Sequence, residues 1–281
     1  MKPGVESQTA VLVCMGRAVA HGVSSVAKFQ DPTAFALLPE EARLRVQRFR
    51  EGVPSGFAKR LEHEHLARES QLMVARTVAI DEAVRRAAAP QLVILGAGLD
   101  GRAWRMSELR DSVVFEVDHP DSQRQKQARG AALTPAAQEI RFVPVDFEQD
   151  DLEAALAAAG HDPARPTTWI WEGVVMYLRR SEIEATLGVL QRRSAVGSRV
   201  IIAYHIPALI LLLVALFVRR LGEPIRSAFK PEQMRALLAR YGFAVVSDEA
   251  LPAIGVSLSE EVGKATRIMK HMHIVTADRV A

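Results

Sequence analysis

A turn that contains three glycines follows an apolar run in the segment VILGAGLDGRAWR (93–105). Gly96, Gly98 and Gly101 have no Cβ, so the backbone at these positions can approach a bound molecule closely. The spacing Gly-x-Gly-x-x-Gly after a strand is typical of a loop that cradles the pyrophosphate of a dinucleotide. The same turn also suits a cofactor that contains adenosine and no phosphate.

Asp100, within this turn, helps to separate the two kinds of cofactor. A pyrophosphate is held by backbone N–H groups and a helix dipole, and a carboxylate beside it would repel it. S-adenosylmethionine has no phosphate and carries a sulfonium and an ammonium group. Asp100 therefore favours the methyl donor over a nicotinamide dinucleotide, although Arg102 or Arg105 could instead pair with it.

Three further carboxylates follow apolar runs that we expect to be strands. Asp118 follows FEV in the segment FEVDHP, Asp146 follows FVPV and Glu172 follows TTWIW. The carboxyl ends of parallel strands meet at one edge of a sheet, which is where ligands bind in open α/β folds. Asp118 or its neighbour Glu116 lies about 20 residues after the glycine turn, the spacing expected of a carboxylate that accepts ribose hydroxyls. A helix cap would explain any one of these acids, and the three together indicate a shared site.

The elements that must position these residues follow from the pattern of apolar runs. From residue 91 onward, short runs that are apolar throughout alternate with helical segments such as 151–160 and 181–194, which predicts a doubly wound, mostly parallel α/β sheet. The predicted strands are 91–95, 112–117, 140–145, 167–171 and 199–206, and two later runs, 243–249 and 271–278, are expected to add edge strands, giving seven. Before residue 90 the pattern is helical. We expect an N-terminal helical extension at 1–70 and a cofactor-binding domain at 71–281, with a lid insertion at about 206–228.

Five ordered segments together resemble the leucine carboxyl methyltransferase family, which includes polyketide carboxyl O-methyltransferases. They are ARTVAIDEAV, VILGAGLDGRAWR, FEVDHP, VPVDFEQD and WEGVVMYL, within about 70–180. A weaker similarity extends to FQDPTAFALL and to 222–243. The resemblance implies a Rossmann-like class I methyltransferase fold and S-adenosyl-L-methionine as the cofactor.

The resemblance also implies roles for individual residues. It assigns Arg76 to the methionine carboxylate, Gly96 and Gly98 to close approach along the methionine moiety, Asp118 to the ribose, Asp146 and Phe147 to the adenine, and Glu172 to the amino-acid end of the cofactor. Lys28 is the candidate for a basic residue that the family carries near its N-terminus. Gly101 departs from the family, in which many members have threonine.

The chemistry that follows is O-methylation of a small-molecule carboxylate or hydroxyl in secondary metabolism. A carboxylate acceptor is already ionised at neutral pH, whereas a hydroxyl needs a general base. Tyr177, His205 and His119 are the nearest candidates for that base, and each is more often structural. The alternatives are a protein C-terminal carboxyl methyltransferase, a nicotinamide oxidoreductase and a cofactor-binding protein without catalysis.

Composition limits the other functions and partners. The chain has 281 residues and a net charge of only +3, with both signs interspersed, so we expect no nucleic-acid partner. The single cysteine fits a reducing compartment, and we expect a cytoplasmic protein. The apolar stretch at 10–15 is too short for a secretion signal. His63 and His65 lie in a helical stretch, where side chains at i and i+2 do not face one another. His271 and His273 could share one face of a strand but have no evident third ligand, so we expect no metal.

The run IPALILLLVALFV (206–218) is a long apolar segment within the expected insertion. It has 13 residues, whereas a membrane-spanning helix needs about 20, so we expect no membrane span. The run is followed by Arg219 and Arg220, and it could form a lid over a hydrophobic acceptor. Alternatively it could be a helix of the core or of a dimer interface, so a homodimer is possible.

Overall fold

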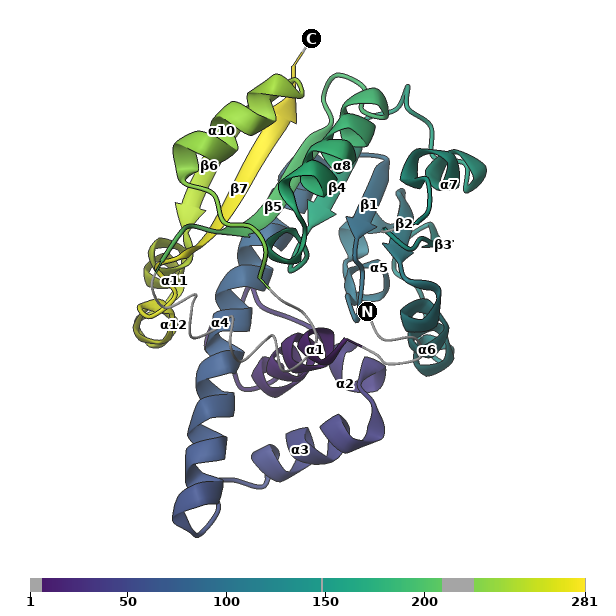
Figure 1. Cartoon of the computed structure of the whole chain (residues 1–281). Helices are drawn as coiled ribbons and strands as arrows, with labels where there is room; N and C mark the ends of the chain where they lie inside the picture. The colour runs from purple at the N-terminus through teal and green to yellow at the C-terminus, as the bar shows by residue number, and fades with distance from the viewer. Residues whose placement is uncertain (1–6, 148, 209–224, 281) are drawn as a thin grey trace.

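A seven-stranded sheet forms the centre of the part of the chain that the computed structural model describes, residues 7–147, 149–208 and 225–280 (Figure 1). Its order is β3-β2-β1-β4-β5-β7-β6. The strands are β1 (Gln91–Leu95), β2 (Val113–Asp118), β3 (Glu139–Pro144), β4 (Thr167–Trp171), β5 (Arg199–His205), β6 (Phe243–Ala250) and β7 (Met272–Arg279). The first five are parallel, and β7 is antiparallel to both of its neighbours. The predicted doubly wound α/β fold is confirmed.

One strand lies elsewhere than predicted. The run at 271–278 was expected at an edge, but β7 lies between β5 and β6, and only β6 is an edge strand. The burial of the two strands gives the reason. Most of β7 is buried, whereas β6 alternates between exposed and partly buried residues, as an edge strand with one solvated face does.

Helices cover both faces of the sheet. Alternate residues of β1 therefore pack against two different sets of helices. Leu92 and Ile94 pack with α4 (Phe57–Ala87), α11 (Leu251–Leu258) and α12 (Glu260–Thr266). Val93 and Leu95 pack on the other face. That face is covered by α7 (Leu152–Ala158), α8 (Arg180–Arg192) and α10 (Pro231–Arg240). Burial on both faces explains why β1 and β4 are apolar along almost their whole length.

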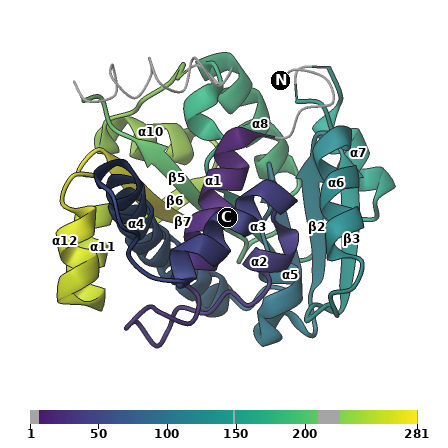
Figure 2. The same ribbon diagram turned by 90° about the horizontal axis from the view of Figure 1, so that it is seen from below.

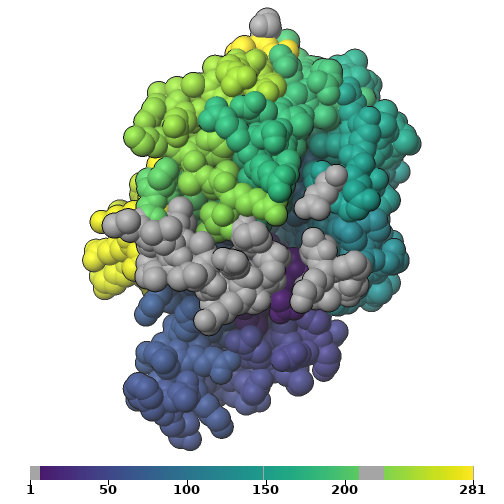
Figure 3. All heavy atoms as spheres, viewed as in Figure 1, coloured from purple at the N-terminus to yellow at the C-terminus, as the bar shows by residue number. Residues whose placement is uncertain are grey.

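The N-terminal extension is built into the core. It consists of α1 (Gln8–Ala20), α2 (Ala34–Leu37), α3 (Glu40–Arg50) and the first half of α4. Helix α4 is continuous from Phe57 to Ala87, so the expected boundary at residue 70 falls inside it. Figure 2, seen from below, shows α1 lying across the ends of the strands. In the space-filling view the extension forms the lower part of the molecule (Figure 3).

The expected lid insertion lies mainly outside the described residues, which resume at residue 225. From there an irregular segment leads to α10, and the backbone N–H groups of Arg226 and Ser227 donate to the Met176 carbonyl over 2.7 and 3.2 Å. Among the described helices, none is both long and apolar enough to cross a membrane.

Candidate active site

A cavity of about 500 Å³ opens where the parallel strands end, with α1 as one of its walls. Seven residues predicted for the cofactor site all line it: Arg76, Gly96, Gly98, Asp118, Asp146, Phe147 and Glu172. They come from α4, from the last residue of β2 and from the loops that follow β1, β3 and β4. The fold therefore brings together residues that the sequence separates widely.

The glycine turn has the backbone conformation that glycine favours. Gly96 has φ of +67° and Gly98 has φ of +47°, both in the left-handed region. A Cβ on Gly96 would lie 2.3 Å from Val174 Cγ2. Gly101 has an ordinary φ of −105°, and its Cβ would lie 2.1 Å from Thr33 Oγ1. Gly101 does not line the cavity, so its glycine is explained by packing against the N-terminal extension and not by a ligand.

Asp118 fastens this turn to the end of β2. Its Oδ2 accepts from the Gly98 N–H at 2.5 Å, and its Oδ1 accepts from the His119 N–H at 2.6 Å. Burial raises the pKa of the Asp118 carboxyl, although the two N–H groups oppose that shift. Each oxygen has a second lone pair that can accept from a hydroxyl in the cavity. The geometry fits the predicted ribose contact without testing it.

The end of β3 places Asp146 and Phe147 at another wall of the cavity. The Asp146 N–H donates to Asp150 Oδ2 at 2.8 Å, and Gln149 Nε2 donates to Asp146 Oδ2 at 2.8 Å. Phe147 packs partly buried against the core that lies beneath α7 and α8. A fixed carboxylate next to an aromatic ring suits a purine, and the adenine assignment stays a prediction.

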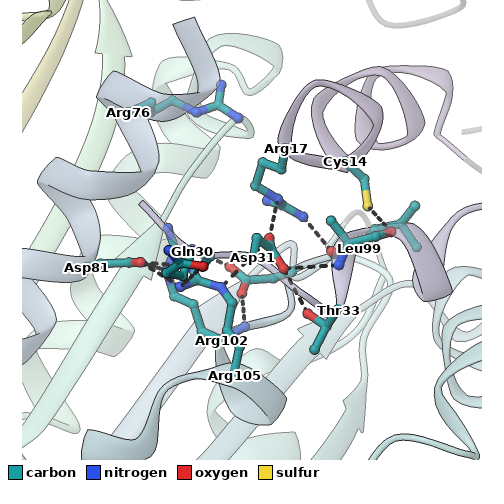
Figure 4. A network of polar contacts seen from close by, with 12 residues as sticks. Cys14, Arg17, Gln30, Asp31, Thr33, Arg76, Asp81, Leu99, Arg102 and Arg105 are labelled. Atoms are coloured by element: carbon teal, nitrogen blue, oxygen red, sulfur yellow. Dashed lines mark hydrogen bonds and ion pairs between the residues drawn. The ribbon is translucent and has the colours of Figure 1, made fainter. Parts of the chain in front are cut away.

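A buried network of charges closes the cavity on the side of α1 and α4 (Figure 4). Arg102 is its centre, and its side chain is only 1% exposed. Its guanidinium contacts Asp81 at 2.7 Å, Glu172 at 3.0 Å and also Asp100. The other pairs are Arg76 with Glu172 at 2.6 Å, Arg105 with Asp81 at 2.7 Å and Arg17 with Asp31 at 3.0 Å, and Arg105 also contacts Asp31 at 3.7 Å. Four guanidinium groups and four carboxylates make this network formally neutral.

Guanidinium groups of the network keep Glu172 and Asp100 ionised. Burial alone would raise the pKa of Glu172, but Arg76 and Arg102 outweigh it and hold that pKa below its usual value. In the same way Arg102 and Arg17 overcome burial and lower the pKa of Asp100. Asp100 is therefore a paired charge, and Arg102 is its partner. Because its charge is paired, Asp100 would not repel a pyrophosphate as the sequence suggested. It therefore favours the methyl donor over a dinucleotide less strongly than expected.

Arg17 is the site residue that the sequence analysis missed. It lines the cavity beside Arg76, and its Nη2 donates to the Leu99 carbonyl at 2.6 Å. Lys28, the predicted basic residue of the extension, is instead 63% exposed, pairs with Glu82 at 2.5 Å and does not line the cavity. A signal for Arg17 was present, because it is the sole charged residue in an otherwise apolar helix.

The candidate bases lie in different places. Tyr177 and His119 line the cavity, whereas His205 does not. His205 is buried at the end of β5 and stacks on His271 with 5.2 Å between ring centroids. Burial, assisted by His271 and Arg76, lowers the pKa of His205 to about 4, so it is neutral at pH 7. Within the described ranges no cluster of three or more His, Cys, Asp or Glu side chains could hold a metal ion.

The chain is similar in sequence to a known protein family and to several named proteins. A family model described as leucine carboxyl methyltransferase matches residues 10–191. A Frankia alni protein, named as a candidate S-adenosyl-L-methionine-dependent methyltransferase, is 41% identical over 132 residues, which are 45% of this chain and 46% of the relative. A Mycobacterium marinum protein with the same name is 34% identical over 208 residues, 70% of this chain and 65% of its own length. The aligned region spans about half the length of several of these curated relatives.

The fold also matches solved structures. A candidate methyltransferase of Thermobifida fusca superposes with a TM-score of 0.57 at 15% identity, covering 95% of this chain and 94% of that one. At this identity the likeness concerns the fold alone.

Proposed function

The chain belongs to the leucine carboxyl methyltransferase family, and on that premise we propose that it transfers a methyl group from S-adenosyl-L-methionine to an oxygen of a small-molecule acceptor, preferably a carboxylate. The observation that carries the proposal is the cavity, in which Arg76, the glycine turn, Asp118, Asp146 and Glu172 meet. When bound there, the cofactor supplies a methyl group that is already activated by its sulfonium.

The methionine end of this cofactor is a zwitterion, and the charged network suits one. Arg76 and Arg17 can bind a carboxylate through their planar guanidinium groups, and Glu172 can accept from an ammonium group. Because the network is formally neutral, a zwitterion adds no net charge to a buried region. A free anion would add one, which costs free energy in a site of low dielectric constant.

The other walls of the cavity offer groups that can bind the ribose and the adenine of the cofactor. Asp118 can accept from the ribose hydroxyls with the lone pairs that the Gly98 and His119 N–H groups leave free. Asp146 can accept from the adenine amino group, and Phe147 offers a ring against the base. These three contacts lie at the ends of adjacent strands, β2 and β3.

A carboxylate acceptor is favoured over a hydroxyl because it is already ionised at neutral pH and needs no general base. An ionised carboxylate oxygen attacks the methyl carbon as the carbon–sulfur bond breaks, and no proton has to be removed. A hydroxyl would need one of the candidate bases, of which Tyr177 and His119 line the cavity and His205 does not. The role of the chain is then to exclude water and align the two reactants, which is enough for an activated donor.

Calorimetry with S-adenosyl-L-methionine tests the cofactor assignment. For Asp118→Ala we expect the Kd to rise by roughly tenfold or more, as for loss of charge-assisted hydrogen bonds. Asp111→Ala, which removes an exposed carboxylate outside the cavity, is the matched control and should bind like the wild type. Equal affinity of Asp118→Ala and wild type would refute the ribose contact. Binding of NADH in place of the methyl donor would refute the proposed function.

The acceptor atom has its own test. With S-[methyl-³H]adenosyl-L-methionine and a panel of carboxylic acids and matching alcohols, carboxyl methylation gives a base-labile ester that releases labelled methanol. We expect volatile label from the acids. Base-stable label from the alcohols alone would show that hydroxyls are the acceptors.

A further inference from the structure

Arg226 stands at the cavity on the side opposite to the proposed adenine site. In the sheet order β3-β2-β1-β4, Asp146 follows β3 at one end and Glu172 follows β4 at the other. Arg226 lies against the turn after β4, because its backbone N–H donates to the Met176 carbonyl at 2.7 Å. Ser227 Oγ donates to the Val175 carbonyl at 2.7 Å and fastens the same segment. Arg226 is thus fixed beside the wall that carries Tyr177, beyond the proposed methionine site.

The charge of Arg226 has no carboxylate partner in the described part of the chain. The other two arginines that line the cavity are paired, Arg17 with Asp31 and Arg76 with Glu172. Glu182 lines the same cavity, but its Oε2 accepts from the Arg179 N–H at 2.6 Å at the start of α8. Among the described residues, Arg226 therefore presents a guanidinium group without an acidic partner at the acceptor side of the cavity.

We propose that Arg226 binds an anionic group of the methyl acceptor and thereby selects anionic over neutral acceptors. The planar guanidinium fork matches the two oxygens of a carboxylate, which makes this the preferred anion. Arg226 is a specificity residue, and its partner on the acceptor is a carboxylate held at the rim of the cavity. Neutral compounds of the same shape lack this contact. The inference rests on the proposed function, because it takes the opposite end of the cavity as the cofactor site.

Binding of matched carboxylates and amides tests this directly. The probes are 2-naphthoate against 2-naphthamide and octanoate against octanamide, titrated into protein saturated with S-adenosylhomocysteine. We expect the wild type to bind each acid roughly tenfold or more tightly than its amide, in line with a charged hydrogen bond. Arg226→Gln should lose that preference, and Arg226→Lys should keep part of it.

Arg235→Gln is the matched control, because Arg235 is an exposed arginine that lies on α10 and outside the cavity lining. It should keep the full preference for acids. The affinity for S-adenosylhomocysteine should be the same in all four proteins. An unchanged preference in Arg226→Gln, or no preference in the wild type, overturns the role of Arg226 while the cofactor site stands. Failure of the wild type to bind S-adenosylhomocysteine overturns the proposed function itself.

Discussion

Two clusters of buried charge lie behind the glycine turn, and they are built differently. The first is the network around Arg102 (Figure 4), and its members Arg17, Arg76 and Glu172 line the cavity. The second is a single pair, Lys126 with Glu116, at 2.7 Å and with side chains 1% and 0% exposed. Neither member of the pair lines the cavity. Both clusters are buried, so a difference in pKa between their acids reflects the neighbouring charges.

Asp81 in the network and Glu116 in the pair respond differently to burial. In the network, Asp81 contacts both Arg102 and Arg105, and these guanidinium groups outweigh burial and lower its pKa. In the pair, burial outweighs the single ammonium group of Lys126 and raises the pKa of Glu116 to about 7. An acid in the network therefore cannot give up its charge easily, whereas Glu116 can.

The largest expected effect is the loss of the centre of the network. Arg102→Met leaves Asp81, Asp100 and Glu172 with fewer partners while they remain buried. We expect the free energy of unfolding to fall by about 3–5 kcal/mol, the usual cost of breaking a buried ion pair from one side. Urea denaturation measures it, with the exposed Arg110→Met as control. A loss below about 1 kcal/mol, no larger than that of an exposed pair, would mean that the network is not charged as described.

Lys126→Met should have a smaller effect that depends on pH. The folded-state pKa of Glu116 lies above its unfolded value of 4.5, so the stability linked to its protonation is fully present below pH 4.5 and is lost as the pH rises through the folded pKa. Removing Lys126 raises that pKa further. We expect a loss of about 2 kcal/mol at pH 8, below the usual cost of about 3–5 kcal/mol for a broken buried pair because Glu116 can take up a proton, and a smaller loss at pH 5.5. Equal losses at the two pH values would contradict the protonation of Glu116.

The two clusters should also differ in their link to the cofactor. S-adenosyl-L-methionine stabilises a protein that binds it only in the folded state, by an amount that grows with affinity. Arg17→Met should weaken binding by roughly tenfold, equivalent to about 1.4 kcal/mol, and reduce the thermal shift at a fixed cofactor concentration. Lys126→Met should keep the affinity of the wild type. A loss of affinity in Lys126→Met as large as in Arg17→Met would remove the functional distinction between the clusters.

The sheet could be predicted from the sequence because its signal is local. The runs QLVIL and TTWIW match β1 and β4 residue for residue, since strands buried on both faces are continuously apolar. The neighbours of β7 could not be predicted in the same way. The antiparallel pairing of β7 between β5 and β6 depends on contacts far apart in the chain, and its apolar run fits an edge or an internal strand equally well.

The candidate site likewise contains residues that a local sequence signal predicts and residues that depend on contacts far apart in the chain. Asp118 and Glu172 were predicted because they directly follow strands, and the fold carries the ends of those strands to one edge. Arg17 was missed because its contacts are Asp31 and the carbonyl of Leu99, 82 positions away. Lys28 was the predicted cation, but its side chain pairs with Glu82 at the surface. Which cation of a helical extension reaches the site depends on packing that the sequence pattern does not encode.

The smallest expected effect comes from replacing both members of the pair, in Glu116→Leu combined with Lys126→Met. Two apolar side chains of similar volume need no partner, and exchanging a buried ion pair for such residues is often neutral. We expect the double variant to lie within about 1 kcal/mol of the wild type, although each single variant is destabilised. The variant should also lose the fall in stability that Glu116 causes between pH 4.5 and about 7. A double-mutant cycle at pH 6 and pH 8 measures both. If the double variant is as unstable as Lys126→Met, then the charges of the pair stabilise the fold, as we expect of the network, and the contrast between the two clusters fails.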